Sequence, residues 1–167
     1  MKTLRKTIYL SIVCLAMVFT SCSSDDDNND DDGGGQGGAE FLTAKIDGAN
    51  FEAAQDPAVI VSATTSNGVL IVHGGNNSGE TIRATINDYT GVGIYQTGNS
   101  ISNVNSLTYL TLPANAWMST FDIGSGTLEV ISDDGTTIEG TFSFEGFNAQ
   151  AQSTKNITDG SFKAIIE

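Results

Sequence analysis

The sequence feature that most constrains this chain is the segment from Ile138 to Glu145, where small or apolar residues alternate with polar ones without a break. Successive side chains of a β-strand point to opposite faces, so a period of two residues is typical of a strand with one buried face. The turn sequence Ser132-Asp133-Asp134-Gly135 lies before this segment, and residues 126–131, the expected first strand of the hairpin, lie before the turn. The sequence therefore predicts a β-hairpin over residues 126–144.

The same alternation and the same turn residues recur between residues 40 and 167, which have the length of one domain. The other expected strands are 42–46, 51–53, 58–64, 69–73, 81–86, 106–112, 116–121 and 156–166, with a further short one at 92–95. Residues 96–106 are polar and predict a long loop, and no window has a helical period. We expect an all-β domain, a single antiparallel β-sandwich or flattened β-barrel of roughly 8–10 strands.

The N-terminus has the pattern of a signal peptide over residues 1–21. Lys2, Arg5 and Lys6 form a basic start, and the apolar run from Ile8 to Phe19 follows. This run is too short to cross a hydrocarbon core of about 30 Å as a helix. It therefore predicts the apolar part of a cleaved signal peptide.

The sequence Phe19-Thr20-Ser21-Cys22 resembles the lipobox of bacterial lipoproteins, with Phe19 where that family usually has leucine. The resemblance implies cleavage before Cys22 and acylation of its thiol, which would hold the chain on a membrane. The alternative is an ordinary secreted protein cut near Ser21, but that would leave a single exposed thiol in an oxidising compartment. We expect Cys22 to be the lipid attachment site.

Residues 22–39 predict a disordered tether, because a run of aspartates and then of glycines cannot bury apolar surface. A serine and acids directly after the lipid cysteine resemble the surface-export signal of Bacteroidota-type lipoproteins. The resemblance implies a lipid anchor in the outer membrane, with the domain facing the cell exterior. Calcium binding by the aspartate run is the alternative, but a flexible segment would have to be ordered to bind the ion.

Three segments of the domain extend this resemblance. Thr43–Gly48, Ile138–Phe144 and Ile157–Phe162 are similar to sequences of small Bacteroidota lipoproteins of unknown function. The similarity covers most of residues 41–167. It implies an all-β domain on an envelope anchor, with no activity to carry over.

The charge balance argues against nucleic acid and anionic membrane surfaces as partners. The whole chain has a net charge of −13, and fourteen of its acids lie from Glu40 onward. The basic residues in the same part are Lys45, Arg83, Lys155 and Lys163. A domain of about −10 lacks the basic footprint that such partners require.

We find no pattern of catalytic or metal-binding residues and expect no cofactor. His73 is the only histidine and ends a strand, without a serine elbow or a second metal ligand. Asp133 and Asp134 are in a turn, where aspartate is expected for backbone reasons. Glu139 and Glu145 lie on one strand, roughly 20 Å apart, farther than a glycosidase pair.

Aromatic residues are unevenly distributed. The tyrosines after residue 40 and the only tryptophan fall between Tyr89 and Trp117, in a stretch rich in asparagine. Aromatic rings beside amides are typical of sugar-binding surfaces. The alternative is that the rings fill the core, as most do, with Tyr95 or Trp117 as the exception. The candidate ligand-binding residues are Trp117, Tyr95, Tyr109 and Asn105.

These observations lead to three functional hypotheses. The first is a lipid-anchored, non-enzymatic binding or adhesion domain of the cell envelope, with a glycan among the candidate ligands. The second is a structural or assembly partner of an outer-membrane protein complex. The third is a small hydrolase that uses carboxylates from separate strands. A concave aromatic cleft would favour the first hypothesis, and an exposed sheet edge or apolar patch would favour the second.

Overall fold

The computed structural model describes residues 39–54 and 61–167. The predictions for the signal peptide, Cys22 and the tether fall outside the described residues, as does the first part of the strand expected over 58–64. The described residues contain no helix that is long and apolar enough to cross a membrane.

The described residues form eleven strands, and every strand pairing is antiparallel. They are β1 (Phe41–Ile46), β2 (Ala49–Glu52), β3 (Ser62–Ser66), β4 (Val69–Gly75), β5 (Glu80–Ile86), β6 (Gly93–Thr97), β7 (Ser106–Thr111), β8 (Asn115–Thr120), β9 (Ser125–Asp133), β10 (Thr137–Asn148) and β11 (Ser153–Ile165). The predicted all-β fold is confirmed. The number of strands is slightly above the expected 8–10, and the short strand expected at 92–95 is present as β6, which pairs with β9.

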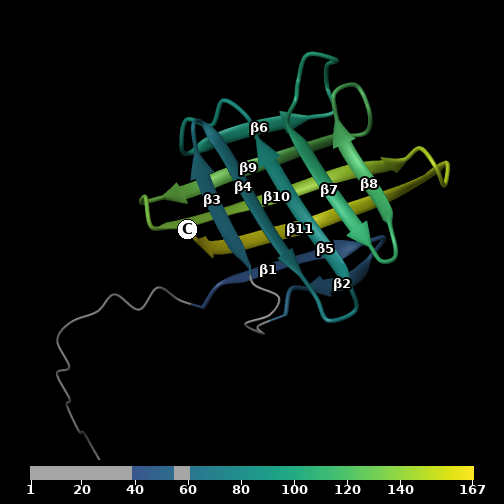
Figure 1. The fold of residues 1–167 in the computed structure, drawn as a ribbon, viewed down its shortest axis with the longest axis horizontal. Helices are drawn as coiled ribbons and strands as arrows, with labels where there is room; N and C mark the ends of the chain where they lie inside the picture. Colours follow the sequence, from purple (N-terminus) through teal and green to yellow (C-terminus); the bar gives the residue numbers. More distant parts are fainter. Residues whose placement is uncertain (1–38, 55–60) are drawn as a thin grey trace, which may run out of the picture. The chain divides into compact units, whose positions relative to one another are not determined.

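The strands belong to one continuous sheet that curls into two layers (Figure 1). Its order is β2-β1-β11-β10-β8-β7-β5-β4-β3, and β9 and β6 branch from β10. One layer contains β3, β4, β5, β7 and β8, and it crosses over the strands β6, β9, β10, β11 and β1. A single bridge from Ala63 to Ile166 joins β3 to the residue after β11. The domain is therefore a curled half-barrel flattened into two layers.

The branch point lies on β10, which is long enough to pair with two strands on one edge. Residues from Ile138 to Glu145 pair with β9, whereas Phe147 pairs with Met118 of β8. Strands β10 and β8 approach so closely there that a Cβ on Gly146 would lie 2.8 Å from the carbonyl carbon of Trp117. Only glycine leaves room for this approach.

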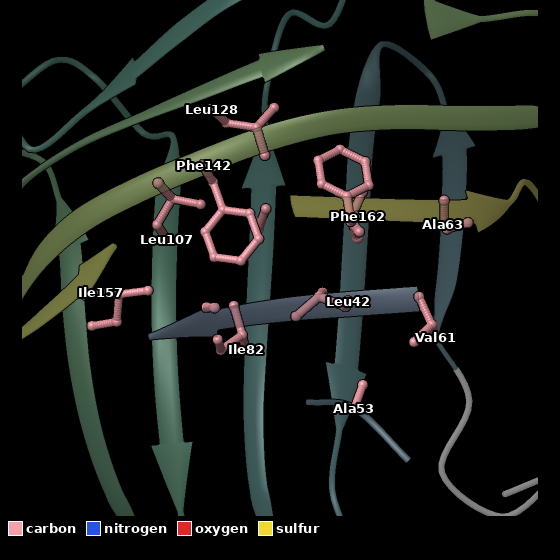
Figure 2. Packing of buried hydrophobic residues seen from close by; sticks show 14 of the residues in the cluster. Leu42, Ala53, Val61, Ala63, Ile82, Leu107, Leu128, Phe142, Ile157 and Phe162 are labelled. Atoms are coloured by element: carbon pink, nitrogen blue, oxygen red, sulfur yellow. The ribbon is translucent and has the colours of Figure 1, made fainter. Parts of the chain in front are cut away.

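The core lies between the two layers and follows the predicted alternation. Ile82, Ala84 and Ile86 of β5 are buried, as are the inward positions of the 138–145 segment. Figure 2 shows side chains from both layers meeting in this core.

Two glycines of the core face aromatic rings. Phe142 lies opposite Gly160, and Phe162 lies opposite Gly140, on the neighbouring strands β10 and β11. A Cβ on Gly140 would lie 2.7 Å from the ring of Phe162, and one on Gly160 would lie 2.5 Å from the ring of Phe142. Each ring therefore covers the backbone of the glycine across from it. Such an arrangement compensates for the weakening effect of glycine within a strand.

Candidate functional site

The aromatic candidates separate into two groups at opposite ends of β5. Tyr109 pairs across from Ile82, near the start of this strand, whereas Tyr89 follows its end. We call the first group the packed end, formed by Glu80, Tyr109, Trp117, Ser153 and Lys155. The second group is the open end, formed by residues 65–69, 89–91, Tyr95 and Asp133.

At the packed end, Tyr109 is a core residue with 4% of its surface exposed. Its hydroxyl donates a hydrogen bond to Oε1 of Glu80, and Nδ2 of Asn76 donates to the other carboxylate oxygen at 2.7 Å. Both bonds lower the pKa of Glu80, while burial and the bond to Glu80 raise the pKa of Tyr109. Glu80 points inward because it shares a face of β5 with Ile82.

Trp117 completes the packed end, and its polar group is also bound. Its ring lies 5.7 Å from that of Tyr109, and Nε1 donates to Oγ of Ser153 at 3.0 Å. Nζ of Lys155 stands 5.7 Å from the ring centroid and forms an ion pair with Asp47 at 2.7 Å. Strands β5, β7, β8 and β11 are thus held together through side chains that already have partners.

At the open end, the second aromatic pair is anchored by turns. The hydroxyl of Tyr89 donates to Oδ2 of Asp133 at 2.7 Å, and its ring lies 5.6 Å from that of Tyr95. The hydroxyl of Tyr95 donates to the carbonyl of Gly91 at 2.7 Å and accepts from the amide of Thr90 at 3.2 Å. Burial and the bond to Asp133 raise the pKa of Tyr89. Both tyrosines are therefore held in fixed positions.

A groove of about 410 Å³ lies beside Tyr89. Its lining combines one ring, one carboxylate, three hydroxyl side chains and one amide, in the set Thr65, Ser66, Asn67, Gly68, Val69, Tyr89, Thr90, Gly91 and Asp133. Asn67 and Gly68 both have positive φ, at 51° and 76°, as a two-residue hairpin turn requires. The amide of Tyr89 donates to the carbonyl of Gly68 at 2.7 Å, which joins this turn to the segment after β5.

Asn105, the fourth candidate, organises the loop before β7. Its amide oxygen accepts from the backbone of Asn87 at 2.8 Å, and its amide nitrogen donates to the carbonyl of Gln96 at 3.2 Å. Asn103 donates to the same carbonyl at 2.7 Å. The polar groups of Asn105 therefore hold the loop against β6.

The structure leaves the remaining titratable candidates apart. His73 is exposed on β4, where Nδ1 lies 3.5 Å from Oγ of Ser62. Glu139 pairs with Lys163 at 2.7 Å on the outer face of β10, and Asp134 accepts hydrogen bonds inside its own turn. In residues 39–54 and 61–167, no three histidine, cysteine or acidic side chains gather into a metal site.

The candidate list from the sequence included Tyr95, whose ring packs against that of Tyr89, but none of the residues that line the groove. Ser66, Asn67, Gly68 and Asp133 were expected only as turn residues, Tyr89 was only one of the clustered aromatics, and Thr65 was assigned no role. The turns after β3 and β9 were expected from the sequence, and in the structure they lie at the same end of the domain as the end of β5. That these turns would meet could be recognised only from the order in which the strands pair.

Comparison with known proteins identifies a family but no activity. Residues 39–166 match the family described as a domain of unknown function, DUF6252. No curated protein and no solved structure matches the chain. Because the match covers more than half of the sequence, the chain belongs to the DUF6252 family.

Proposed function

We propose that this protein is a non-enzymatic binding domain of the cell envelope, anchored by a lipid on Cys22, that takes a neutral glycan in the groove at the open end. The observation that carries the proposal is the groove itself, where one fixed ring and one carboxylate stand beside hydroxyl and amide side chains. An apolar ring face with a few convergent polar groups is the usual make-up of a small-ligand site.

The charge of the domain favours a neutral ligand. Asp133 is the only ionisable carboxylate in the groove lining, and no basic residue belongs to that lining. An anionic ligand would meet this carboxylate without a compensating charge. A neutral sugar would instead exchange hydrogen bonds with Asn67, Ser66 and Thr65, which are exposed turn or strand-end residues.

The composition of the groove favours binding over catalysis. Its titratable side chains are Tyr89 and Asp133, which are hydrogen-bonded to each other. Asp133 also accepts from the amide of Gly135 at 2.9 Å, so its carboxylate stabilises the turn before β10. General acid–base chemistry needs a group that can exchange a proton with the substrate. The side chains of Tyr89 and Asp133 are instead engaged in hydrogen bonds within the domain.

The test is a thermal melt of residues 23–167 with a panel of neutral and acidic oligosaccharides, and with calcium and EDTA. A ligand at 100 times its dissociation constant adds about 2.7 kcal/mol to the free energy of unfolding, which raises the melting midpoint by several degrees. Asn67→Gly should abolish the shift, because glycine keeps the turn but removes the amide. The matched control Asn77→Gly changes an exposed turn beyond β4 and should keep the shift. A panel without any shift would contradict glycan binding.

The envelope anchor is tested separately. Cys22→Ser in the full chain removes the thiol that would carry the lipid, so we expect the protein to move from the membrane fraction to the soluble fraction. Fractionation followed by immunoblotting measures this. A variant that stays with the membrane would refute the anchor and leave the groove proposal untouched.

A further inference from the structure

The carboxylates of this acidic domain are unevenly distributed between its two layers. In β3, β4, β5, β7 and β8 the only acid is Glu80, which points inward at the packed end. The outer face of these five strands therefore presents no carboxylate, and we call it the acid-free face. The outer face of the other layer carries Glu129, Glu139 and Glu145 on β9 and β10.

The acid-free face holds an unpaired positive charge. Arg83 is exposed at the middle of β5, across from His73 of β4 and Thr108 of β7. The lysines of the described residues are all ion-paired: Lys45 with Asp159, Lys155 with Asp47 and Lys163 with Glu139. Arg83 has no ion pair within residues 39–54 and 61–167. Its guanidinium is thus the charge that remains available to an outside partner.

An apolar groove continues the same face. The row that starts at Arg83 passes through Thr108 to Met118 of β8. Met118, which is 38% exposed, lines a groove of about 250 Å³ together with Ala116, Ile123 and Phe147. Two strand spacings separate Arg83 from Met118, about 10 Å.

We propose that the acid-free face docks a partner protein that places a carboxylate on Arg83 and an apolar side chain in the groove at Met118. Arginine and methionine are enriched at protein interfaces, whereas lysine and acids are depleted there. This face carries Arg83 and Met118 and has no lysine and no outward-facing acid on its five strands. Arginine binds a carboxylate through two parallel hydrogen bonds. The docking surface is distinct from the groove at the open end and does not depend on the proposed glycan.

Two other occupants fit the face less well. A second copy placed face to face would bring no carboxylate to Arg83, because this face has none. A glycan would lack a stacking platform, since Tyr109 and Trp117, the aromatic residues of these strands, belong to the packed end. A partner protein with a carboxylate and an apolar side chain on its surface would pair with the Arg83 guanidinium and also fill the groove at Met118.

The test is site-specific photo-crosslinking of the full chain in intact cells that naturally produce it. A photoreactive residue replaces Thr108 at the centre of the acid-free face, or, as the matched control, Thr141 on the outer face of β10. We expect a discrete adduct with one protein from position 108 and none from position 141. Arg83→Glu should reduce this adduct at least tenfold, and Arg83→Lys should retain part of it.

A charge-reversal experiment tests whether Arg83 itself contacts a carboxylate of the partner. In the crosslinked partner, the carboxylate nearest to the adduct is changed to lysine, which should restore the adduct with Arg83→Glu. Met118→Glu, which puts a charge into the groove, should also remove the adduct and serves as the second variant if Arg83→Glu does not fold. An adduct that survives both variants, equal adducts from both positions, or crosslinking only to lipid, to glycan or to a second copy would overturn the proposal.

Discussion

The two ends of β5 carry aromatic pairs of similar geometry but different surroundings. The ring centroids are 5.7 Å apart in Tyr109–Trp117 and 5.6 Å apart in Tyr89–Tyr95. The first pair lies on the adjacent strands β7 and β8, and its polar atoms bind side chains of β5 and β11. The second pair lies in and after the segment that joins β5 to β6, and its hydroxyls bind a turn and a backbone carbonyl.

The difference teaches what leaves an aromatic pair available to a ligand. Regular strands bring neighbouring side chains together on both sides of a ring, so Tyr109 is enclosed. Turns supply backbone hydrogen bonds and short polar side chains, so the surface beside Tyr89 stays open as a groove. The same residue types therefore stabilise the fold at one end and offer a surface at the other.

The largest effect that we expect is on global stability. Tyr109→Ala should lower the free energy of unfolding by about 3–5 kcal/mol, because it removes a core ring and leaves a cavity. Tyr89→Ala should cost less than about 2 kcal/mol, since this ring is half-buried beside a groove. Urea denaturation of the two variants measures the difference. Equal losses would break the comparison between the ends.

A smaller effect should follow from removing the indole nitrogen. Trp117→Phe loses the hydrogen bond to Ser153, worth about 1 kcal/mol, and weakens the contact with Lys155 by up to about 1 kcal/mol. The matched change at the open end, Tyr95→Phe, also deletes a single polar group from a half-buried ring. Ligand-induced melting shifts should remain in Trp117→Phe. Loss of the shift in that variant alone would move the binding site to the packed end.

The packed end should also respond to pH. Glu80 has a pKa below its usual 4.5 because it accepts hydrogen bonds from Tyr109 and Asn76. A lowered folded-state pKa adds stability that is present above this usual value and is lost as the pH falls through the folded value. Glu80→Gln should therefore be less stable than the natural chain at neutral pH, by under about 1 kcal/mol because the carboxylate is partly in solvent.

The pH dependence gives this prediction its check. Urea midpoints of the natural chain and of Glu80→Gln should converge as the pH falls through the lowered pKa of Glu80, where the natural carboxylate takes up its proton. A difference that stays constant between neutral and acidic pH would show that the hydrogen bonds of Glu80 do not depend on its charge.

The smallest effect concerns the hairpin turn of the groove. Asn67→Gly should change the free energy of unfolding by less than about 0.5 kcal/mol, because both residues accept positive φ and the side chain is exposed. The same thermal melts that test the ligand measure this without one. A large destabilisation would mean that Asn67 holds the turn, and the loss of ligand binding in this variant would no longer identify a contact.

Local patterns determined much of the fold in advance. The hairpins at 47–48, 66–68 and 132–135 are present because a turn and its two flanking strands are close in the sequence. Strand faces followed from the alternation in β1, β5 and β10. The branch of the sheet at Phe147 and the pairing of β6 with β9 were not predictable, since both depend on contacts between distant segments.

The candidate site shows the same division. The sequence pointed to the interval from Tyr89 to Trp117, but it could not separate the two aromatic pairs. Tyr89 meets Asp133 across 44 residues of chain. Only the order of the strands brings the three turns around the groove to one end of the domain, and the same order gathers five strands without an outward acid into one face.

What the sequence by itself determined is the set of strands, their inward faces and their turns, because these follow from a period of two and from residues that accept positive φ. The tertiary structure decided how the strands share edges, and it explains residues that no local pattern could. Gly140 and Gly160 are examples: each lies under a phenylalanine ring from the neighbouring strand, where a Cβ would not fit. Packing across strands is non-local, so its consequences become visible only once the sheet is assembled.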